Sequence, residues 1–508
     1  MSVKIGWAEV DITPEKGTKI GLAGQFFERI TDEVESPVTV TAFALDSGDD
    51  QMIICSCDLV SIGVNLKNIV KEKLKDKLPI SPDKVIINAI HTHTSYDYTR
   101  TGINSGSTLS VLKEFLPEDM EYQPLVNKEE GMNPDTALNF LAEKIYLAII
   151  KAWDARTEGY YQFAFGRAVV GMNRRVCYDD GSAKMWGDTN LANFEELEAG
   201  NDSGIEIMYA FDKNKELTGV IANVACPSQV VEHRSFISSD YWGKVKENLR
   251  KRFGKNLFVL GLCSAAGDLC PRDLVRWVNP ETPIDDPNIH RENYIERRAD
   301  PSMFDVSGLK VVGRRISNEL ISVYEELDKS KMKNDAVLKH ETFNLTLPLR
   351  RVTIKEYNEA QEKIADFVKN NRGKRVTFDD NARLHVYAGT IARYRFQQKV
   401  NTFDTEIHVI RFDDVAIATN PFELFLNYGN KIRARSLAKQ TFLIQLACGA
   451  LGYLPTEKAE KGSHYSAYVS SGSAGHEGGD ILVRTTLEHI NAMFKNRPQF
   501  TDGKEKAE

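Results

Sequence analysis

The chain of 508 residues lacks several features, and each absence excludes a class of protein. No apolar run reaches membrane-spanning length, so no transmembrane segment is predicted. Basic residues are not in excess, since 65 Lys and Arg stand against 72 Asp and Glu, and the net charge of −7 argues against nucleic acid as a partner. The sequence also contains no internal repeat, low-complexity tract or long linker. With 42% hydrophobic and 27% charged residues, the composition is typical of a globular protein with a large core.

Cysteine is scarce as well. The seven cysteines are odd in number and lie mostly within apolar runs, a pattern that favours reduced thiols over a disulfide framework. The opening segment Met1–Trp7 has no basic-then-apolar leader, so no signal peptide is predicted. The expected location is therefore cytoplasmic.

Short apolar runs, several of them rich in β-branched residues, alternate with segments of helical periodicity. The runs of strand length are Val38–Leu45, Gln51–Cys57, Lys84–Ile90, Ile205–Tyr209, Leu217–Val224, Leu257–Leu262, Ile407–Ile410 and Val415–Thr419. Helices are predicted at Leu66–Lys77, Asp135–Asp154, Trp242–Phe253, Gly308–Leu327 and Arg484–Phe494. This alternation predicts an α/β fold in which mixed β-sheets pack between helices.

A single domain is predicted over residues 1–500, with a polar tail at 501–508. Three segments within it are predicted to be insertions. Residues 101–134 and 271–306 lack regular periodicity, and 353–400 carries two charged stretches of helical period. Long segments without regular structure are usually functional lids or disorder. Gly472–Gly479 is interpreted as a flexible turn before the last helix.

The most informative pattern is an apolar run that ends abruptly in two histidines, His91 and His93. On a β-strand, residues i and i+2 point to the same face. The two imidazoles are therefore expected side by side at the carboxyl end of a strand, where α/β proteins place ligand sites. His340, His385, His408 and His489 have no recognisable partner and are interpreted as structural or surface residues, and Cys448 as a packing residue.

Other apolar runs also lead into polar turns that contain glycine or proline. These turns lie within 222–229, 259–271, 415–423 and 451–456. If all these ends converge, His, Cys, Glu and Tyr side chains gather in one cleft. Nitrogen, oxygen and sulfur donors of this mix suit Zn²⁺, especially when one position stays open for water.

Taken in order, these motifs resemble the catalytic domain of the neutral ceramidases, the zinc-dependent non-lysosomal amidases, and their bacterial relatives. The resemblance rests on Gly6–Pro14, Ser56–Leu59, His91–Thr94, Asn173–Arg175, Ile237–Asp240, Gly267–Pro271, Asn420–Glu423 and Tyr453. These motifs span nearly the whole chain. The resemblance implies a ceramidase-like catalytic domain without the C-terminal immunoglobulin-like domain of the larger members.

The resemblance also implies roles for individual residues. His91, Glu423 and Tyr453 match zinc ligands of the family. His93, Arg174 and Tyr465 match the groups that hold the substrate carbonyl and its developing oxyanion. Each such donor contributes roughly 3–4 kcal/mol in comparable sites.

The chain departs from the family pattern at two positions. Cys226 stands where the family has its second histidine ligand, and a thiolate can bind zinc. Gln229 and His233 are alternative fourth ligands, and loss of this ligand is a further alternative. Cys270 stands where the family has a serine, and it either contacts the reacting carbonyl or is a small buried residue.

The function implied by the resemblance is zinc-dependent hydrolysis of a linear amide or related acyl bond in a small-molecule substrate. One alternative is a metal-free cysteine hydrolase that uses Cys270 with His93 as base. Another is a non-catalytic binding protein with a degraded site. The sequence leaves the natural substrate and the oligomeric state open.

The segment that follows Cys270 is charged, and this bears on the substrate. Its charged residues are Arg272, Asp273, Arg276, Asp285, Asp286, Arg291, Glu292, Arg297 and Arg298. A ceramidase needs an apolar entrance to bury long alkyl chains. We therefore expect a smaller or more polar substrate than ceramide, such as an anionic one that arginine binds in bidentate fashion. The alternative is a solvated surface loop far from the cleft.

Overall fold

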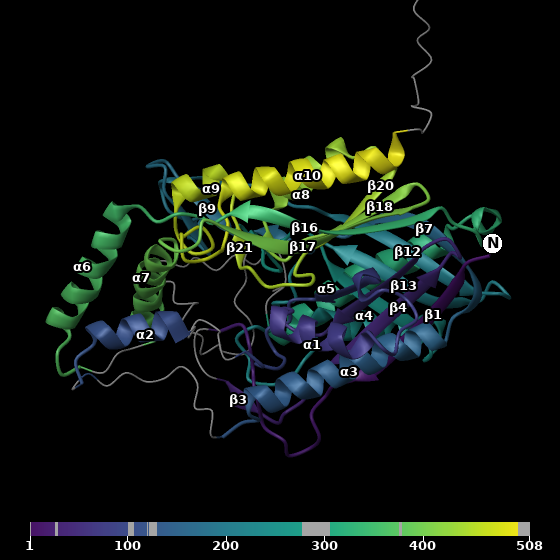
Figure 1. Ribbon diagram of the computed structural model, residues 1–508, viewed down its shortest axis with the longest axis horizontal. Coiled ribbons are helices and arrows are strands. Elements are labelled where there is room, and N and C mark those ends of the chain that lie inside the picture. Colours follow the sequence, from purple (N-terminus) through teal and green to yellow (C-terminus); the bar gives the residue numbers. More distant parts are fainter. Residues whose placement is uncertain are drawn as a thin grey trace, which may run out of the picture.

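The structure is a computed structural model that describes residues 2–25, 29–99, 106–118, 120, 130–276, 305–374 and 378–495. An eight-stranded sheet and a four-stranded sheet pack face to face, and helices cover the outer face of each (Figure 1). The predicted α/β fold with mixed sheets between helices is therefore confirmed.

The larger sheet mixes parallel and antiparallel pairs. Its order is β14 (Phe258–Cys263), β13 (Leu217–Val224), β12 (Gly204–Asp212), β7 (Thr157–Arg167), β1 (Lys4–Asp11), β4 (Thr39–Asp46), β5 (Gln51–Cys57) and β6 (Val85–Ala89). The pairs β13–β14 and β5–β6 are parallel. These parallel pairs lie at the two edges and direct the carboxyl ends of their strands toward the candidate site.

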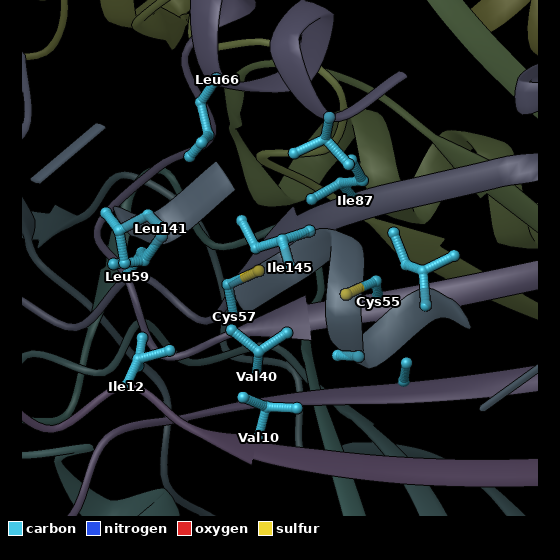
Figure 2. Packing of buried hydrophobic residues seen from close by; sticks show 14 of the residues in the cluster. Val10, Ile12, Val40, Cys55, Cys57, Leu59, Leu66, Ile87, Leu141 and Ile145 are labelled. Atoms are coloured by element: carbon cyan, nitrogen blue, oxygen red, sulfur yellow. The ribbon is translucent and has the colours of Figure 1, made fainter. Parts of the chain in front are cut away.

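Alternating side chains of the larger sheet contact different layers. Cys55 and Ile87 pack against α1 (Val64–Leu74) and α3 (Pro134–Asp154), as Figure 2 shows for part of this cluster. Ile54 and Ile86, one position away on the same strands, point to the opposite face and pack against the smaller sheet. Helices α4 (Tyr241–Phe253) and α5 (Asp305–Glu325) cover the rest of the outer face. Strands buried on both faces explain why these runs are almost continuously apolar.

The smaller sheet has the order β16 (Leu338–Pro348), β17 (Thr402–Phe412), β18 (Val415–Thr419) and β20 (Gln440–Ile444). Helices α8 (Leu426–Arg435) and α10 (His476–Phe494) lie along its outer face (Figure 1). The interpretation of Gly472–Gly479 as a turn is wrong in its second half, because α10 already begins at His476. A Cβ on Gly479 would come within 2.3 Å of the Tyr428 ring, so glycine allows close packing against α8 here.

The two helical stretches predicted within 353–400 are α6 (Ile354–Asn370) and α7 (Phe378–Phe396). A capping box between Thr353 and Glu356 begins α6. These helices pack with α2 (Gly106–Phe115) at one end of the molecule (Figure 1). The predicted insertions at 101–134 and 271–306 lie partly outside the described residues, and the 501–508 tail lies wholly outside them. Within the described part of the chain, no helix combines the length and apolar character needed to cross a bilayer.

Several very short strands position residues around the site. β8 (Met172–Asn173) pairs with β15 (Leu269–Cys270), and β19 (Glu423–Leu424) pairs with β21 (Tyr453–Leu454). A small three-stranded sheet consists of β10 (Ala183–Met185), β9 (Arg175–Tyr178) and β11 (Phe194–Leu197). Other short elements are β2 (Ile20–Gly21), β3 (Ile30–Thr31), α9 (Glu457–Gly462) and the 3-10 helices Pro82–Lys84 and Lys329–Lys331.

Candidate functional site

The segments that leave the carboxyl ends of β6, β13, β14, β18 and β20 meet in one place. The Ser228 hydroxyl, after β13, donates to the carbonyl of Ile90 at the end of β6 at 2.8 Å. The Gly267 amide, after β14, donates to the Leu424 carbonyl after β18 at 2.8 Å. The five predicted ends therefore converge, and they bring residues far apart in the sequence into contact.

His91 is held in one orientation by its own backbone and by the segment that follows β5. Its φ of 71° lies in the left-handed region, which is costly for a residue other than glycine and concentrates at functional sites. The backbone amide donates to Leu59, and the ring Nδ1 donates to the Val60 carbonyl at 2.7 Å. Because Nδ1 carries this proton, the Nε2 of a neutral His91 is an electron-pair donor that points into the site.

The Nε2 atom of His91 faces two other groups at equal distance. The Glu423 carboxylate oxygen Oε2 lies 3.3 Å away, and the Nε2 atom of His93 also lies 3.3 Å away. Burial alone would raise the pKa of the Glu423 carboxyl, but His91, Arg174 and Tyr453 together lower it below its ordinary value. Glu423 is therefore a buried carboxylate in its charged form.

His93 also presents an unprotonated nitrogen to this point. The Gln229 amide Nε2 lies 2.9 Å from His93 Nε2, and Arg174 Nη1 donates to Gln229 Oε1 at 3.2 Å. Since the carbonyl oxygen of Gln229 is taken by Arg174, its amide nitrogen donates to His93. The pKa of His93 lies well below its usual range because burial, His91 and Arg29 disfavour the charged ring, and its Nδ1 lies 3.2 Å from Glu232.

The electron pair of His91 Nε2 thus faces the Glu423 carboxylate and the nitrogen of the His93 ring across contacts of 3.3 Å each. Without a positive charge between them, these groups repel one another in a buried, low-dielectric environment. A proton on His91 or a bound cation removes this repulsion. The donor set of imidazole nitrogen and carboxylate oxygen fits zinc, and the residues present are compatible with such an ion.

Donors for an oxyanion surround the same point. Arg174 Nη2 donates to the Gly267 carbonyl at 3.1 Å and lies 3.4 Å from the Tyr453 hydroxyl. The hydroxyls of Tyr453 and Tyr465 are 3.3 Å apart, and burial raises the pKa of Tyr465 to about 12. Tyr465 therefore keeps its proton at neutral pH and can donate it in a hydrogen bond. The Nε of Arg174 is buried without an acceptor among the described residues.

The remaining predicted site residues lie differently. The Cys226 thiol is fully buried and directed at the carbonyls of Val170 and Pro227, at 3.5 and 3.6 Å, within the core under α4. His233 faces Asp305, with Nε2 3.6 Å from the carboxylate. Of the three alternatives for the fourth ligand, Gln229 is the one with a hydrogen bond to His93 among the contacts described above.

Cys270 is also fully buried. Its thiol donates to the Arg272 carbonyl at 3.3 Å, and it lies on β15 opposite Met172. Burial raises its pKa to about 12, although Arg174 and Arg272 lower it in part. The thiol is therefore protonated at neutral pH, which makes it a weak nucleophile.

A second group of metal-binding side chains was missed from the sequence. Glu406, His408 and Cys448 have ligand atoms within 4.8 Å of one another, and all three are largely buried. Glu406 and His408 lie on β17 with the same i, i+2 spacing that His91 and His93 show just after β6, and this spacing is the signal that the sequence offered. Both oxygens of Glu406 already accept from lysines, Oε1 from Lys71 at 2.6 Å and Oε2 from Lys67 at 3.1 Å.

Comparisons with known proteins agree on the fold. No family model and no curated protein sequence matches the chain. Among solved structures, the neutral ceramidase from Pseudomonas aeruginosa matches with a TM-score of 0.66 at 16% identity, over 97% of this chain and 75% of that one. A ceramidase complexed with C2 matches with a TM-score of 0.65 at 14% identity, over 97% and 76% of the two chains. The chain therefore has a neutral-ceramidase-like fold, as the sequence motifs had indicated.

Proposed function

We propose that this protein is a metal-dependent hydrolase of a linear amide or related acyl bond. The observation that carries the proposal is the contact of His91 Nε2 with the Glu423 carboxylate beside the His93 ring, two electron-pair donors that a proton or a metal cation would hold together. His91, Glu423 and Tyr453 would hold the metal, with zinc as the best match to these donors. Cys226 is left out of this set because its thiol points to backbone carbonyls in the core.

Zinc held by His91, Glu423 and Tyr453 would supply hydroxide at neutral pH, because zinc lowers the pKa of a bound water to about 7. The other residues have tasks of their own. Arg174 and Tyr465 donate hydrogen bonds to the carbonyl oxygen as it becomes an oxyanion. Gln229 keeps the proton of His93 on Nδ1 and holds Arg174 at the same time. Such preorganised donors are often the largest contribution to catalysis.

The proposed substrate is smaller or more polar than ceramide. Arg272 is only 2% exposed, and its guanidinium and that of Arg174 lie 5.8 and 5.7 Å from the Trp186 ring. Two arginines beside one aromatic ring would suit a substrate with a carboxylate or phosphate group. Arg276 pairs with Asp273 near this point, and the other charged residues of the segment lie outside the described part of the chain.

The metal-free alternative, a cysteine hydrolase, has less support. A nucleophilic cysteine needs a thiolate and an adjacent base. Cys270 instead donates to the Arg272 carbonyl, and burial keeps its pKa near 12. The non-catalytic alternative is separated from the proposal by an activity assay.

The proposal is tested with purified protein, a panel of short polar N-acyl compounds and a fluorescent ceramide. We expect hydrolysis of at least one polar compound, loss of that activity after chelation, and recovery when zinc is restored. Activity that survives complete removal of metal would contradict the metal-dependent mechanism. Hydrolysis of ceramide alone would show that the polar substrate class is wrong, and no hydrolysis at all would favour a binding protein.

A further inference from the structure

Arg175 follows Arg174 directly, but its side chain contacts different neighbours. Its backbone belongs to β9, and its guanidinium is fully buried. The Nε atom donates to the Glu198 carboxylate at 2.8 Å, and Glu198 is buried as well. A buried arginine with a buried carboxylate partner is costly to desolvate unless its other donors are satisfied.

The remaining donors of Arg175 all bind one segment of the chain, residues 459–466. Nη1 donates to the carbonyl of Tyr465 at 3.2 Å and to the hydroxyl of Ser466 at 3.4 Å. Nη2 donates to the carbonyls of Ala459 and Ser463 at 3.2 and 3.0 Å. Together with Nε, these contacts use all five N–H groups of the guanidinium.

The segment that Arg175 binds has a backbone conformation that needs support. Ser463, His464 and Ser466 have φ values of 60°, 74° and 71°, all in the left-handed region that favours glycine. Such residues persist only where their surroundings hold them. Tyr465 lies between them, and its hydroxyl reaches the Tyr453 hydroxyl at 3.3 Å.

We infer that Arg175, charge-balanced by Glu198, is a positioning residue that fixes the backbone of Tyr465 and thereby places its hydroxyl in the site. This inference rests on the proposed function, in which that hydroxyl stabilises an oxyanion. Lysine cannot replace this arginine, because an ammonium group offers three donors from one point and cannot span five acceptors. Arg174 thus contacts the site directly, whereas Arg175 holds the segment that carries Tyr465.

The inference is tested by a double-mutant cycle between Arg175→Lys and Tyr465→Phe. We expect Arg175→Lys to lower kcat on the order of 100-fold with KM changed less than about 3-fold, as for loss of one oxyanion donor. In the Tyr465→Phe background, the same change should lower kcat less than about 3-fold, because the effect passes through the lost hydroxyl. Arg250→Lys is the matched control, since Arg250 also pairs with a carboxylate, that of Glu9, and it should leave kcat unchanged.

A second readout does not depend on activity. With 3-fluorotyrosine placed at position 465, we expect one narrow ¹⁹F resonance in the otherwise unchanged protein and in Arg250→Lys. In Arg175→Lys that resonance should shift or split. Glu198→Gln keeps the arginine but removes its counter-charge, so it should shift the resonance less. This variant replaces Arg175→Lys in the measurement if Arg175→Lys does not fold. An unshifted resonance in the Arg175 and Glu198 variants, or additive losses of kcat in the cycle, would overturn the inference. If the unchanged protein hydrolyses nothing, the proposed function fails while the resonance still decides the inference.

Discussion

Two buried groups of histidine and glutamate in this protein differ in what balances their charge. In the first, which we call the His91 cluster (His91, His93, Glu423 and Tyr453), the only ion-pair partner of Glu423 within the described residues is His91. In the second, the His408 cluster (Glu406, His408 and Cys448), Lys67 and Lys71 bind the carboxylate directly.

The comparison shows that two similar sets of donor atoms can differ in whether a bound metal cation would stabilise them. The His408 cluster contains its own cations, and a metal ion there would have to approach two ammonium groups. In the His91 cluster, the guanidinium of Arg174 lies against the Tyr453 hydroxyl, and among the described residues no lysine or arginine forms an ion pair with the Glu423 carboxylate, so the cluster gains from a bound cation. The closeness of His, Glu and Cys side chains is therefore weak evidence for a metal site. Their hydrogen bonds are better evidence, because these bonds determine which atoms are protonated and which have an electron pair free for a metal.

The largest expected effect comes from removing the charge of one carboxylate in each cluster. Glu423→Gln should abolish metal binding and lower kcat/KM at least roughly 1,000-fold, since it removes a ligand of the cation. Glu406→Gln should leave metal content unchanged. Metal analysis and kinetics on both variants measure the contrast, and equal losses of metal would mean that the clusters do not differ as described.

The next largest effect is expected on kcat when the hydroxyl of Tyr465, beside the His91 cluster, is removed. Tyr465→Phe should lower kcat by about 100- to 1,000-fold, because it removes one hydroxyl that is expected to donate to the oxyanion. Metal content should stay at the wild-type level, since Tyr465 is not a ligand in this account. Full activity of the variant would exclude the tyrosine from the mechanism.

A smaller effect is expected on stability in the His408 cluster. Burial alone raises the pKa of Glu406, but His408 and Lys71 lower it well below its ordinary value of 4.5. A carboxyl with a lowered folded pKa stabilises the protein above its unfolded pKa, and this contribution is lost as pH falls through the folded value. Glu406→Gln should therefore lower the free energy of unfolding by roughly 3 kcal/mol at pH 7, and by progressively less below pH 4.5. Denaturant titrations at several pH values measure this, and a difference that does not shrink in acid would contradict the assignment.

The smallest effect is predicted for Cys226→Ala. Its thiol donates to backbone carbonyls and packs in the core, so zinc content and kcat should remain within about 2-fold of wild type. The free energy of unfolding should fall by about 1–2 kcal/mol, because a buried group is removed. Loss of zinc from this variant would restore Cys226 as a ligand.

Much of this arrangement could be predicted from the sequence, because it depends on local pattern. Apolar runs indicated the strands, and the His91 and His93 spacing indicated paired imidazoles. The expected strand geometry of that pair is wrong, because β6 ends at Ala89 and His91 has a φ of 71°. The helix α10 was predicted to begin too late because Gly478 and Gly479 suggested a turn, whereas a tertiary contact with Tyr428 explains the second of them.

The rest depends on contacts between distant parts of the chain. Cys448 meets His408 across 40 residues, and Arg175 meets Tyr465 across 290. No local pattern distinguishes Arg174, which contacts the site, from Arg175, which binds the segment that carries Tyr465. The direction of the Cys226 thiol could not be predicted either, because a cysteine at the end of a strand can point to either face.

The central claim is that the His91 cluster, and not the His408 cluster, binds the metal. The most direct test is the zinc content of purified wild-type protein, His91→Ala and Cys448→Ala, each confirmed as folded by circular dichroism. The account predicts about one zinc per chain in wild type and in Cys448→Ala, and almost none in His91→Ala. Zinc retained in His91→Ala but lost from Cys448→Ala, or absent from all three after purification with zinc present, would contradict it.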